Sequence, residues 1–309
     1  MKALAATGDR TLVRFAEIPE PTPTADATVI QVEAFSVNRG EILAMTGAYG
    51  TPTEPGTVMG QDVVGRVVAA AADGSGPAVG TRVVGHAEGG GWAERVPVPT
   101  SALVALPDAV PTTTAAALPL AGLTALRLLR HVEAPADKRA LITGASGGVG
   151  HYLVELATAA GIAVTAVAAS PERGARLAEL GAAVIHDVAD ADGPFEVIFE
   201  SVGGDVFAHA LARIAPGGTV LWFGQASLRP IRLSFFEYLT VSPFTLKHFP
   251  HWVADTTDAE DLRVLVDLTA RGRLHPEIGR VAGWAETASV LTDLNNRRIR
   301  GNAILTIDA

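Results

Sequence analysis

The sequence predicts an α/β protein in which a doubly wound parallel sheet is combined with an all-β domain. Short strands separated by turn residues come first, which is the pattern of an all-β domain. From Thr112 onward, apolar strands alternate with helical segments, as in a parallel sheet that helices cover on both faces. A last strand at residues 303–307 follows the complete parallel sheet, so we expect it to rejoin the β domain.

Each element follows from the spacing of its apolar residues. Alternating or glycine-punctuated segments predict strands of the β domain at residues 28–34, 58–69, 81–85 and 92–98. Continuous apolar runs predict parallel strands at residues 140–143, 163–168, 183–186, 196–199 and 219–223. Helical spacing predicts helices at residues 113–118, 123–129, 148–160, 171–180, 206–214, 258–271 and 285–295. The parallel strands end in small or polar residues, and ligands of open α/β sheets bind along that edge.

A glycine-rich turn between the first parallel strand and its helix is the most informative motif. Gly144, Gly147 and Gly150 lie three residues apart, a spacing that permits a tight turn, close approach of a pyrophosphate and close packing of the helix. The amide groups of residues 147–150 would form a helix N-terminus, which favours phosphate. The turn and the helix start therefore predict a dinucleotide site that includes Ser146, Gly148 and Val149.

The end of the next strand indicates which dinucleotide binds. An NAD site places Asp or Glu there to hold the ribose hydroxyls, whereas this chain reads Ala-Ala-Ser-Pro-Glu-Arg over residues 168–173. Ser170 and Arg173 would supply donors to the 2′-phosphate of NADPH. In the alternative interpretation, Ser170 only caps the following helix and Arg173 is a solvated surface charge. The missing acid favours NADPH.

Composition excludes several classes of function. The chain has 309 residues, 48% of them hydrophobic, which suffices for two folded domains, and its net charge of −9 argues against nucleic acid or an anionic membrane as a partner. We expect a cytoplasmic protein, because charge interrupts the N-terminus too early for a signal peptide and no run of eighteen apolar residues occurs. The sequence contains no cysteine, which excludes disulfides, thiolate catalysis and cysteine-ligated zinc. His248 and His251 flank Pro250 without an evident third ligand, so no metal site is expected.

The glycine motif also fits the fingerprint of short-chain dehydrogenases. Those enzymes need a Tyr with a Lys four residues later, because the ammonium lowers the pKa of the phenol for proton transfer. Tyr49, Tyr152 and Tyr238 are followed at that position by Thr, Leu and Ser. The motif also lies behind a β domain instead of at the N-terminus.

This arrangement resembles the medium-chain dehydrogenase/reductase superfamily, in particular its zinc-independent quinone oxidoreductase and enoyl reductase branch. The resemblance covers nearly the whole chain and rests on residues 36–41, 46–49, 59–67, 80–83, 121–125, 201–204 and 216–220 together with the glycine turn. It implies a Rossmann domain over residues 116–271, inserted in a GroES-like β domain formed by residues 1–115 and 272–309. It also implies a homodimer formed through the edge of the Rossmann sheet.

The resemblance implies a metal-free reductase. The zinc alcohol dehydrogenases of the superfamily place Cys where this chain has Asn38, and a His-Glu pair where it has Gln61 and Asp62. We expect Asp62 to be a structural remnant of that site, paired with an arginine such as Arg39. The expected activity is NADPH-dependent transfer of hydride to a quinone or an α,β-unsaturated carbonyl, because the developing charge then spreads over several atoms. The alternatives are a carbonyl reductase, a dedicated biosynthetic enoyl reductase, or an NADPH-binding protein without catalysis.

The same resemblance supplies the remaining site residues. Asn38 and Tyr49 are expected near the nicotinamide as catalytic residues, with Tyr49 as a candidate proton donor; alternatively, Asn38 is a turn residue and Tyr49 a loop anchor. The cofactor is further expected to contact Thr124, Val202, Phe223, Gly224 and Arg300. The aromatic segment at residues 235–252 lines either the substrate cleft or the dimer interface, and its Lys247 is a second candidate proton donor.

Overall fold

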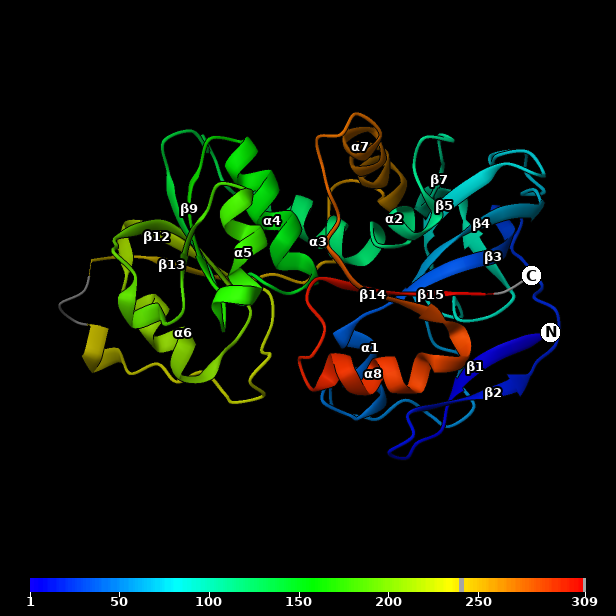
Figure 1. The fold of residues 1–309 in the computed structure, drawn as a ribbon, viewed down its shortest axis with the longest axis horizontal. Coiled ribbons are helices and arrows are strands. Elements are labelled where there is room, and N and C mark those ends of the chain that lie inside the picture. Colours follow the sequence, from blue (N-terminus) through cyan, green and yellow to red (C-terminus); the bar gives the residue numbers. More distant parts are fainter. Residues whose placement is uncertain (239–241, 308–309) are drawn as a thin grey trace. The chain divides into compact units, whose positions relative to one another are not determined.

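The chain folds into two compact units in the computed structural model, which describes residues 1–238 and 242–307 (Figure 1). The first unit contains Met1–Leu123 and Thr256–Ala309, and the second contains Thr124–Asp255. Helix α3 (Pro119–Arg130) passes from one unit to the other. The predicted domain boundary between residues 271 and 272 groups the helix α7 (Asp258–Ala270) with the parallel sheet. In the structure, α7 contacts the strands β5 and β7 and lies in the first unit.

The first unit is built around a seven-stranded sheet with the order β14-β15-β3-β4-β5-β7, and β6 also pairs with β3. Its strands are β3 (Ala27–Val37), β4 (Asp62–Ala69), β5 (Arg82–His86), β6 (Arg95–Pro99), β7 (Leu103–Ala105), β14 (Ile278–Gly283) and β15 (Asn302–Thr306). A separate hairpin joins β1 (Lys2–Ala6) to β2 (Val13–Glu17). The short helices are α1 (Arg39–Met45), η1 (Thr100–Ala102), α2 (Thr112–Ala116), η4 (Trp284–Glu286) and α8 (Thr287–Asn295). The core of this unit packs around Trp92 and Phe35, whose rings stack 5.8 Å apart.

The second unit is a six-stranded, fully parallel sheet with the order β10-β9-β8-β11-β12-β13. Its strands are β8 (Arg139–Ile142), β9 (Ala163–Val167), β10 (Ala183–Ile185), β11 (Phe195–Glu200), β12 (Ile214–Trp222) and β13 (Thr245–His248). Its helices are α4 (Gly148–Ala159), α5 (Pro171–Glu179), η2 (Val188–Asp190), α6 (Gly204–Leu211) and η3 (Phe235–Tyr238). The strand order reverses between β8 and β11, so right-handed crossovers place α4 and α5 on one face and α6 on the other. The helices α4 and α5 lie side by side (Figure 1).

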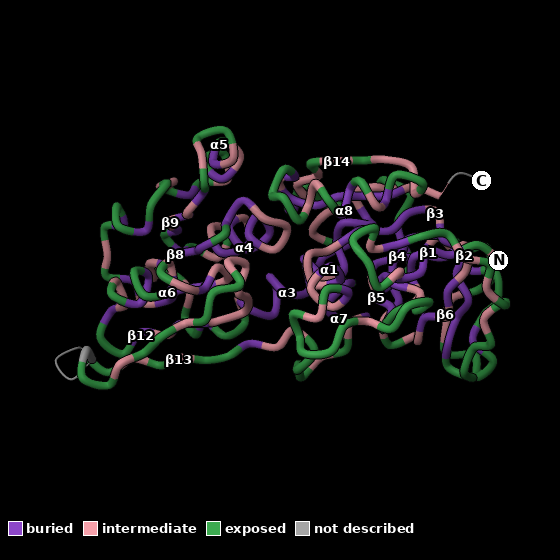
Figure 2. The backbone as a smooth tube through the Cα atoms, turned by 90° about the horizontal axis from the view of Figure 1, so that it is seen from below, coloured by how far each residue is buried: buried purple, intermediate pink, exposed green. Residues whose placement is uncertain are grey.

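The predicted α/β class is confirmed, including the return of the last strand to the β domain. β15 pairs antiparallel with β3, beside the strands that the N-terminal segment supplies. Figure 2 shows that the central strands of each unit are buried, whereas the outer strand β13 is mostly exposed. The carboxyl ends of β8, β9, β11 and β12 lie along one edge of the parallel sheet, where ligands of such sheets bind.

Several elements were absent from the sequence prediction. The parallel sheet is not complete at residues 219–223, because β13 adds a sixth strand beyond β12. Within residues 58–69 only Asp62–Ala69 form a strand, β4, and Val58 makes an isolated bridge with Ala5. The hairpin, α1, β7 and β14 were also not predicted. β13 is only four residues long and partly exposed, so it lacks the apolar run of a buried parallel strand.

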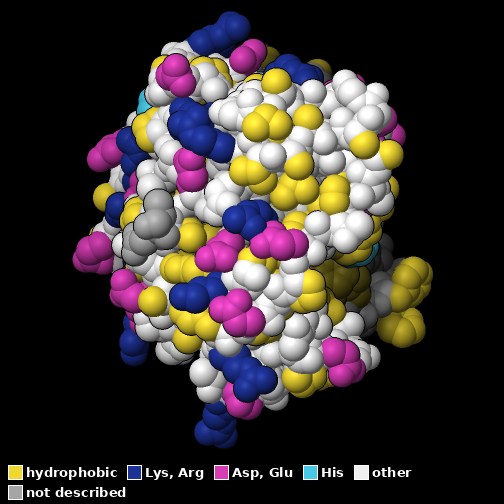
Figure 3. All heavy atoms as spheres, turned by 90° about the vertical axis from the view of Figure 1, so that its right-hand side faces the viewer, with side chains coloured by type: hydrophobic (Ala, Val, Ile, Leu, Met, Phe, Trp, Pro, Cys, Tyr) yellow, Lys and Arg dark blue, Asp and Glu magenta, His cyan; other side chains and the backbone are white. Residues whose placement is uncertain are grey.

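No helix in the described part of the chain is long and apolar enough to span a membrane. On the face drawn in Figure 3, basic and acidic side chains are interspersed instead of separated into patches of one sign.

Candidate functional site

The glycine-rich turn links β8 directly to α4. Gly144 has a positive φ of 61°, a conformation that favours glycine, and α4 begins at Gly148 after Gly147 as its N-cap residue. A Cβ atom placed on Gly150 would lie 2.3 Å from the carbonyl oxygen of Ala145, so no larger residue fits there. Because Gly147 has no side chain, the amides of the first turn of α4 face the carboxyl edge of the sheet without a side-chain cap.

The turn that follows β11 packs against this glycine turn. A Cβ atom on Gly144 would lie only 2.6 Å from the Ser201 hydroxyl oxygen. Ser201 donates its hydroxyl hydrogen to the carbonyl oxygen of Thr143 at 3.1 Å, and its backbone N–H donates to the Thr143 hydroxyl at 3.0 Å. The same Cβ atom would lie 3.6 Å from Val202. The structure therefore brings the predicted residues Gly144 and Val202 together.

The end of β12 joins the same edge. The backbone N–H groups of Ala226 and Ser227 donate to the carbonyl oxygens of Ser201 and Val202, both at 2.8 Å. Phe223 donates in the same way to the carbonyl oxygen of Glu200 at 2.9 Å. The segment after β12, which contains Phe223 and Gly224, is thereby paired with the turn after β11.

Glu200 is a central residue of this edge that the sequence analysis missed. Its side chain is fully buried, and its Oε1 atom accepts hydrogen bonds from Val202 N (2.8 Å), Gly203 N (3.0 Å) and the Thr143 hydroxyl (3.1 Å). Burial raises the pKa of the Glu200 carboxyl, and these three donors oppose the rise. A glutamate that ends the apolar strand Phe195–Glu200 is the sequence signal that could have identified it.

The residues predicted to select NADPH gather at the end of β9. Arg173 donates from Nε to the Ser146 hydroxyl at 3.1 Å, so its guanidinium lies on the glycine turn. Ser170 is the N-cap residue of α5, because its hydroxyl oxygen accepts from the backbone N–H of Arg173 at 3.4 Å. This is the capping role that the alternative interpretation gave to Ser170. The hydroxyl also bonds to the exposed carboxylate of Glu172 and, with the backbone, lowers the pKa of that group.

His186 also lies at the end of β9, although the sequence analysis did not single it out. Its Nδ1 lies 2.9 Å from the carbonyl oxygen of Ala168, which accepts the hydrogen bond because a carbonyl oxygen cannot donate. Its charge also acts on Glu172. The end of β9 therefore presents one arginine, one histidine and one exposed carboxylate to whatever binds there.

In the first unit, Asn38 belongs to a buried polar network. Asn38 donates from Nδ2 to the Ser36 hydroxyl (3.0 Å) and to Oδ2 of Asp62 (2.8 Å). The fully buried Asp62 also accepts from the Ser36 hydroxyl and from the backbone N–H of Leu120 at 2.9 Å. Both N–H bonds of the Asn38 amide are thus directed into the protein.

The expected pairing of Asp62 with an arginine is wrong. Within the described residues, no ion pair reaches Asp62, and its partners are the neutral donors of Ser36, Asn38 and Leu120. Arg39, the candidate partner, instead acts electrostatically on Tyr49 and feels the charge of Arg297. Three donors stabilise a buried carboxylate in place of a cation.

A second buried carboxyl lies beside Asp62. Glu41 accepts from the backbone N–H groups of Asn38 (2.7 Å) and Gln61 (3.1 Å). Burial and the charge of Asp62 raise the pKa of Glu41 well above its usual value, and the two backbone donors oppose the rise. The position that zinc enzymes of the superfamily use for metal ligands is occupied here by two carboxyls and their hydrogen-bond donors.

Tyr49 follows α1 on the surface of the first unit. Its side chain is 69% exposed, and a Cβ atom on Gly40 would lie 3.5 Å from its hydroxyl oxygen. Burial of part of the side chain raises the pKa of Tyr49, and the Arg39 guanidinium opposes the rise. The catalytic role of Tyr49 and its role as a loop anchor both agree with this position.

The other predicted residues lie on different elements. Thr124 is buried in α3 at the start of the second unit. Arg300 lies in the first unit and donates from Nε to Glu277 at 2.6 Å. Lys247 is on β13, with its Nζ 3.2 Å from Nδ1 of His131. Burial and then Lys247 lower the pKa of His131.

The aromatic segment at residues 235–252 is divided in the structure. Phe235, Phe236 and Trp252 are largely exposed, whereas Phe249 is buried. Residues 239–241 lie outside the described part of the chain. In the described residues, no group of three His, Cys, Asp or Glu side chains is arranged to hold a metal ion.

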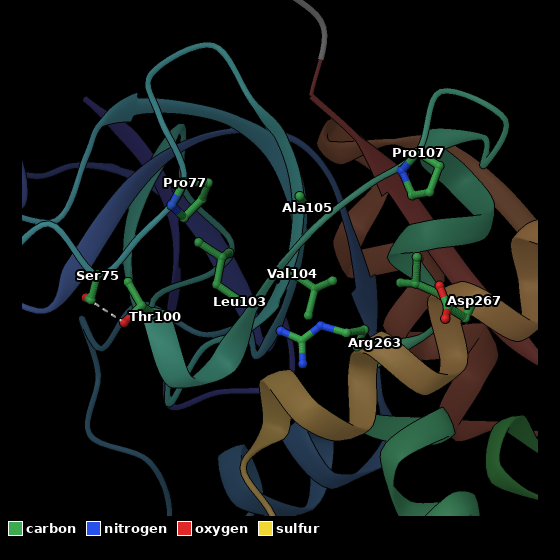
Figure 4. A pocket seen from close by; sticks show the side chains of 10 residues that line it. Ser75, Pro77, Thr100, Leu103, Val104, Ala105, Pro107, Arg263 and Asp267 are labelled. Atoms are coloured by element: carbon green, nitrogen blue, oxygen red, sulfur yellow. Dashed lines mark hydrogen bonds between the residues drawn. The ribbon is translucent and has the colours of Figure 1, made fainter.

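One pocket of about 400 Å³ lies in the first unit between β7 and α7 (Figure 4). Leu103, Val104 and Val266 line it together with Arg263 and Asp267 of α7. None of the residues singled out by the sequence lines this pocket. It is therefore separate from the glycine-rich edge and from the Asn38 network.

Comparison with known proteins agrees with this geometry. Residues 148–268 match the family described as zinc-binding dehydrogenase, and residues 24–108 match the alcohol dehydrogenase GroES-like domain. The chain is 30% identical to a quinone oxidoreductase of Pseudomonas aeruginosa over 97% of both chains. It is 25% identical to an acryloyl-coenzyme A reductase of Sulfurisphaera tokodaii over 90% of this chain and 91% of the other.

Solved structures show the same two-domain fold. A mycobacterial protein complexed with NADPH aligns over 99% of both chains with a TM-score of 0.88 and 26% identity. These matches confirm the GroES-like domain and the doubly wound Rossmann domain that the sequence predicts.

Proposed function

Because the chain belongs to the quinone oxidoreductase branch of the medium-chain dehydrogenase/reductase superfamily, we propose that it is an NADPH-dependent reductase of quinones or α,β-unsaturated carbonyls. The observation that carries the proposal is the glycine-rich edge, where Arg173 lies on Ser146 beside the open first turn of α4. Similarity to the quinone oxidoreductase over nearly the whole chain supports the assignment of a reductase.

The residues of the second unit fit a bound NADPH. Gly148, Val149 and Gly150 would bind the pyrophosphate through their amides, whereas the Gly147 N–H already donates to the carbonyl oxygen of Gly144 at 3.0 Å. Gly150 in particular leaves no room for a side chain. Arg173 would bind the 2′-phosphate, because its guanidinium is held by Ser146 on the cofactor side of α5. Val202, Phe223 and Gly224 would contact the nicotinamide half. When bound, NADPH supplies the hydride that reduces the substrate.

Glu172 would affect how strongly this site binds the 2′-phosphate of NADPH. Its carboxylate is exposed and sits on Ser170, close to where the 2′-phosphate would lie. Since like charges repel and opposite charges attract, Glu172 would weaken NADPH binding, whereas Arg173 would strengthen it. We infer that Ser170 acts chiefly by capping α5 and that Arg173 supplies most of the selectivity for the phosphate.

The residues of the first unit have distinct roles in the proposal. Asn38 has both N–H bonds directed to Ser36 and Asp62, so we assign it to support the site and not to donate to the substrate. Tyr49 keeps a hydroxyl at the surface and remains the proposed proton donor, with solvent as the alternative source. Thr124 and Arg300 remain proposed contacts of the cofactor.

We also propose that the enzyme works without zinc, because of the side chains that it carries at the positions of the zinc ligands. Asn38 and Gln61 supply amide groups where zinc enzymes of the superfamily supply Cys and His, and amides are poor zinc ligands. Asp62 is already bonded to three donors. The carbonyl of the substrate would then be polarised by hydrogen-bond donors.

A second candidate function has specific support. The relative from Sulfurisphaera tokodaii is named an acryloyl-coenzyme A reductase, and acryloyl-coenzyme A is an α,β-unsaturated thioester. A dedicated enoyl thioester reductase would use the same cofactor and the same hydride chemistry. Only the substrate would differ.

Oxidation of NADPH, followed in the presence of EDTA, tests the proposed function. We expect turnover with quinones or with enones and enoyl thioesters, and little turnover with simple ketones. Reduction of ketones alone would favour a carbonyl reductase. Loss of activity with the chelator would contradict zinc independence, and NADPH binding without turnover on the whole panel would favour a non-catalytic role.

A further inference from the structure

Glu200 is a buried carboxylate without a cation partner at the carboxyl edge of the Rossmann sheet. Its side chain has an exposed fraction of 0%, and within the described residues no ion pair reaches it. Burial of a carboxylate is unfavourable unless hydrogen bonds compensate for the lost water. An apolar residue at the end of β11 would avoid this cost but could not accept the hydrogen bonds that Glu200 accepts.

The carboxylate connects two turns that flank the proposed cofactor. On one side it accepts from the Thr143 hydroxyl, in the residue that immediately precedes Gly144. On the other side it accepts from the backbone N–H groups of Val202 and Gly203, with Gly203 N also 3.1 Å from Oε2. Glu200 therefore fixes the position of Val202, a proposed cofactor contact, relative to the glycine turn.

The turn after β11 takes a left-handed backbone conformation at two consecutive glycines, which by themselves leave the chain free to move. Gly203 and Gly204 both have positive φ values, 75° and 57°, immediately before α6. This turn in turn holds residues 226 and 227 through the carbonyl oxygens of Ser201 and Val202. Three segments of the cofactor-binding edge thus meet at one carboxylate.

We propose that Glu200 is a positioning residue: its ionised carboxylate holds the turn at residues 201–204 in the shape that receives the cofactor, and protonation of the carboxylate releases the turn and weakens cofactor binding. That the ligand is NADPH rests on the proposed function, whereas the effect of Glu200 on the conformation of residues 201–204 does not depend on it.

The groups that bond directly to Glu200 do not titrate, so protonation in this cluster falls on Glu200 itself. Its partners from β8 and from the turn after β11 are a hydroxyl and backbone amides, which do not titrate. On the flanking helices, His151 of α4 bonds to the carbonyl oxygen of Gly147 at 3.0 Å, and Asp205 of α6 pairs with Arg229 at 3.5 Å. Burial raises the pKa of the Glu200 carboxyl above its usual value, and its three hydrogen-bond donors oppose the rise.

The test compares Glu200→Gln with a matched substitution on the same strand. Glu196→Gln is the control, because Glu196 also bonds to a backbone N–H near β8, that of Arg139 at 2.8 Å, but at the other end of β11. Hydrogen exchange of the Val202 and Gly203 amides without cofactor, and NADPH affinity by titration calorimetry, are measured between about pH 5 and 8.

For the wild type and Glu196→Gln, we expect amide protection and NADPH affinity both to fall about tenfold toward acidic pH. Glu200→Gln should show low amide protection that does not change with pH, together with a lower NADPH affinity than the wild type at neutral pH, and Glu200→Asp should restore the pH dependence of the protection. A Glu200→Gln protein with the wild-type pH profile would overturn the proposal. Should the wild type bind no NADPH at any pH, the proposed function fails, while the exchange measurement still decides the role of Glu200.

A second variant covers the case in which Glu200→Gln does not fold. Thr143→Val removes one donor that favours the ionised carboxylate, so the transition in amide protection should move to higher pH. Thr143→Ser keeps the hydroxyl and should retain the wild-type transition. An unchanged transition in Thr143→Val would contradict the proposal.

Discussion

At the scale of single residues, three buried carboxyls stand at the centre of the account: Glu41, Asp62 and Glu200. Asp62 and Glu200 are each held by neutral donors, and Glu41 lies between two backbone N–H groups beside Asp62. None of the three has an ion pair among the described residues. Glu200 holds the turn after β11, and Asp62 and Glu41 hold the segments that contain Asn38 and Gln61. The proposed function assigns roles to both regions.

Glu41 predicts a specific dependence of stability on pH. Its pKa is raised in the folded protein, so above the unfolded value of about 4.5 the fold retains a proton that the unfolded chain has released. The free energy of unfolding therefore falls as pH rises through this window, by about 1.4 kcal/mol for each tenfold difference in proton affinity. Glu41→Gln should remove this part of the pH dependence in thermal denaturation.

The exposed Glu54 is the control for this measurement, since its substitution by Gln changes no buried group. Glu54→Gln should follow the wild-type curve over the whole pH range. Parallel curves for Glu41→Gln and the wild type would show that Glu41 does not hold a proton in the fold.

Residues whose role is local were predictable, and residues whose partners are distant were not. Gly144, Gly147 and Gly150 owe their conformations to one short turn, which the sequence displays directly. Glu200 meets Thr143 across 57 positions of the chain, and Asn38 meets Asp62 across 24. Such pairs follow from strand order, so the sequence showed the charges but not their partners.

At the scale of elements, the glycine turn depends on the close packing of α4 against the end of β8. A Cβ atom on Gly150 would meet the carbonyl oxygen of Ala145, and a backbone atom cannot move aside cheaply. Gly150→Ala should destabilise the protein by about 1–3 kcal/mol and weaken NADPH binding. Thermal denaturation and titration with NADPH measure both effects.

Gly89→Ala is the matched control, because a Cβ atom on Gly89 would meet no atom within 4 Å and its φ is not positive. It should leave both quantities unchanged. A Gly150→Ala protein as stable as the wild type, with the same affinity for NADPH, would show that the close approach does not constrain this turn.

The strength of each element's pattern decided whether it was predicted. The buried parallel strands and the amphipathic helices carry long apolar signals and were found within a few residues of their observed ends. β13 and β14 are short and alternate between exposed and half-buried residues. Their pairing with β12 and β15 comes from the tertiary fold, which short sequence windows do not show.

At the scale of the whole molecule, we propose a homodimer through the edge of the Rossmann sheet. Among the residues that the structure describes, β13 pairs with β12 alone, and an unpaired strand edge is a ready template for another chain. Lysine on an edge strand opposes such pairing, so Thr245→Lys should shift the protein from dimer to monomer. Sedimentation velocity measures the change.

Val281→Lys provides the comparison, because Val281 is an exposed residue on β14, the edge strand of the other sheet. This variant should remain dimeric. A monomeric wild type, or a dimer that Thr245→Lys leaves intact, would exclude this interface.

The sequence predicts a class of cofactor at this scale, whereas it predicts no particular substrate. The groups proposed to bind the phosphates of the cofactor are backbone amides and one arginine, which lie in or near a contiguous motif. A substrate is recognised by side chains from several loops, whose shape the sequence does not display. The relatives that match over most of the chain act on different electrophiles, which leaves the substrate to measurement.

Calorimetric titration with NADPH and NADH tests the central claim most directly. Arg176 is the control for Arg173, because it lies one turn further along α5 and pairs with Glu179 at 2.9 Å. We expect the wild type and Arg176→Ala to bind NADPH more tightly than NADH. Arg173→Ala should lose about tenfold or more of its NADPH affinity and keep its affinity for NADH. Equal losses for both cofactors, or a wild type that prefers NADH, would contradict the account.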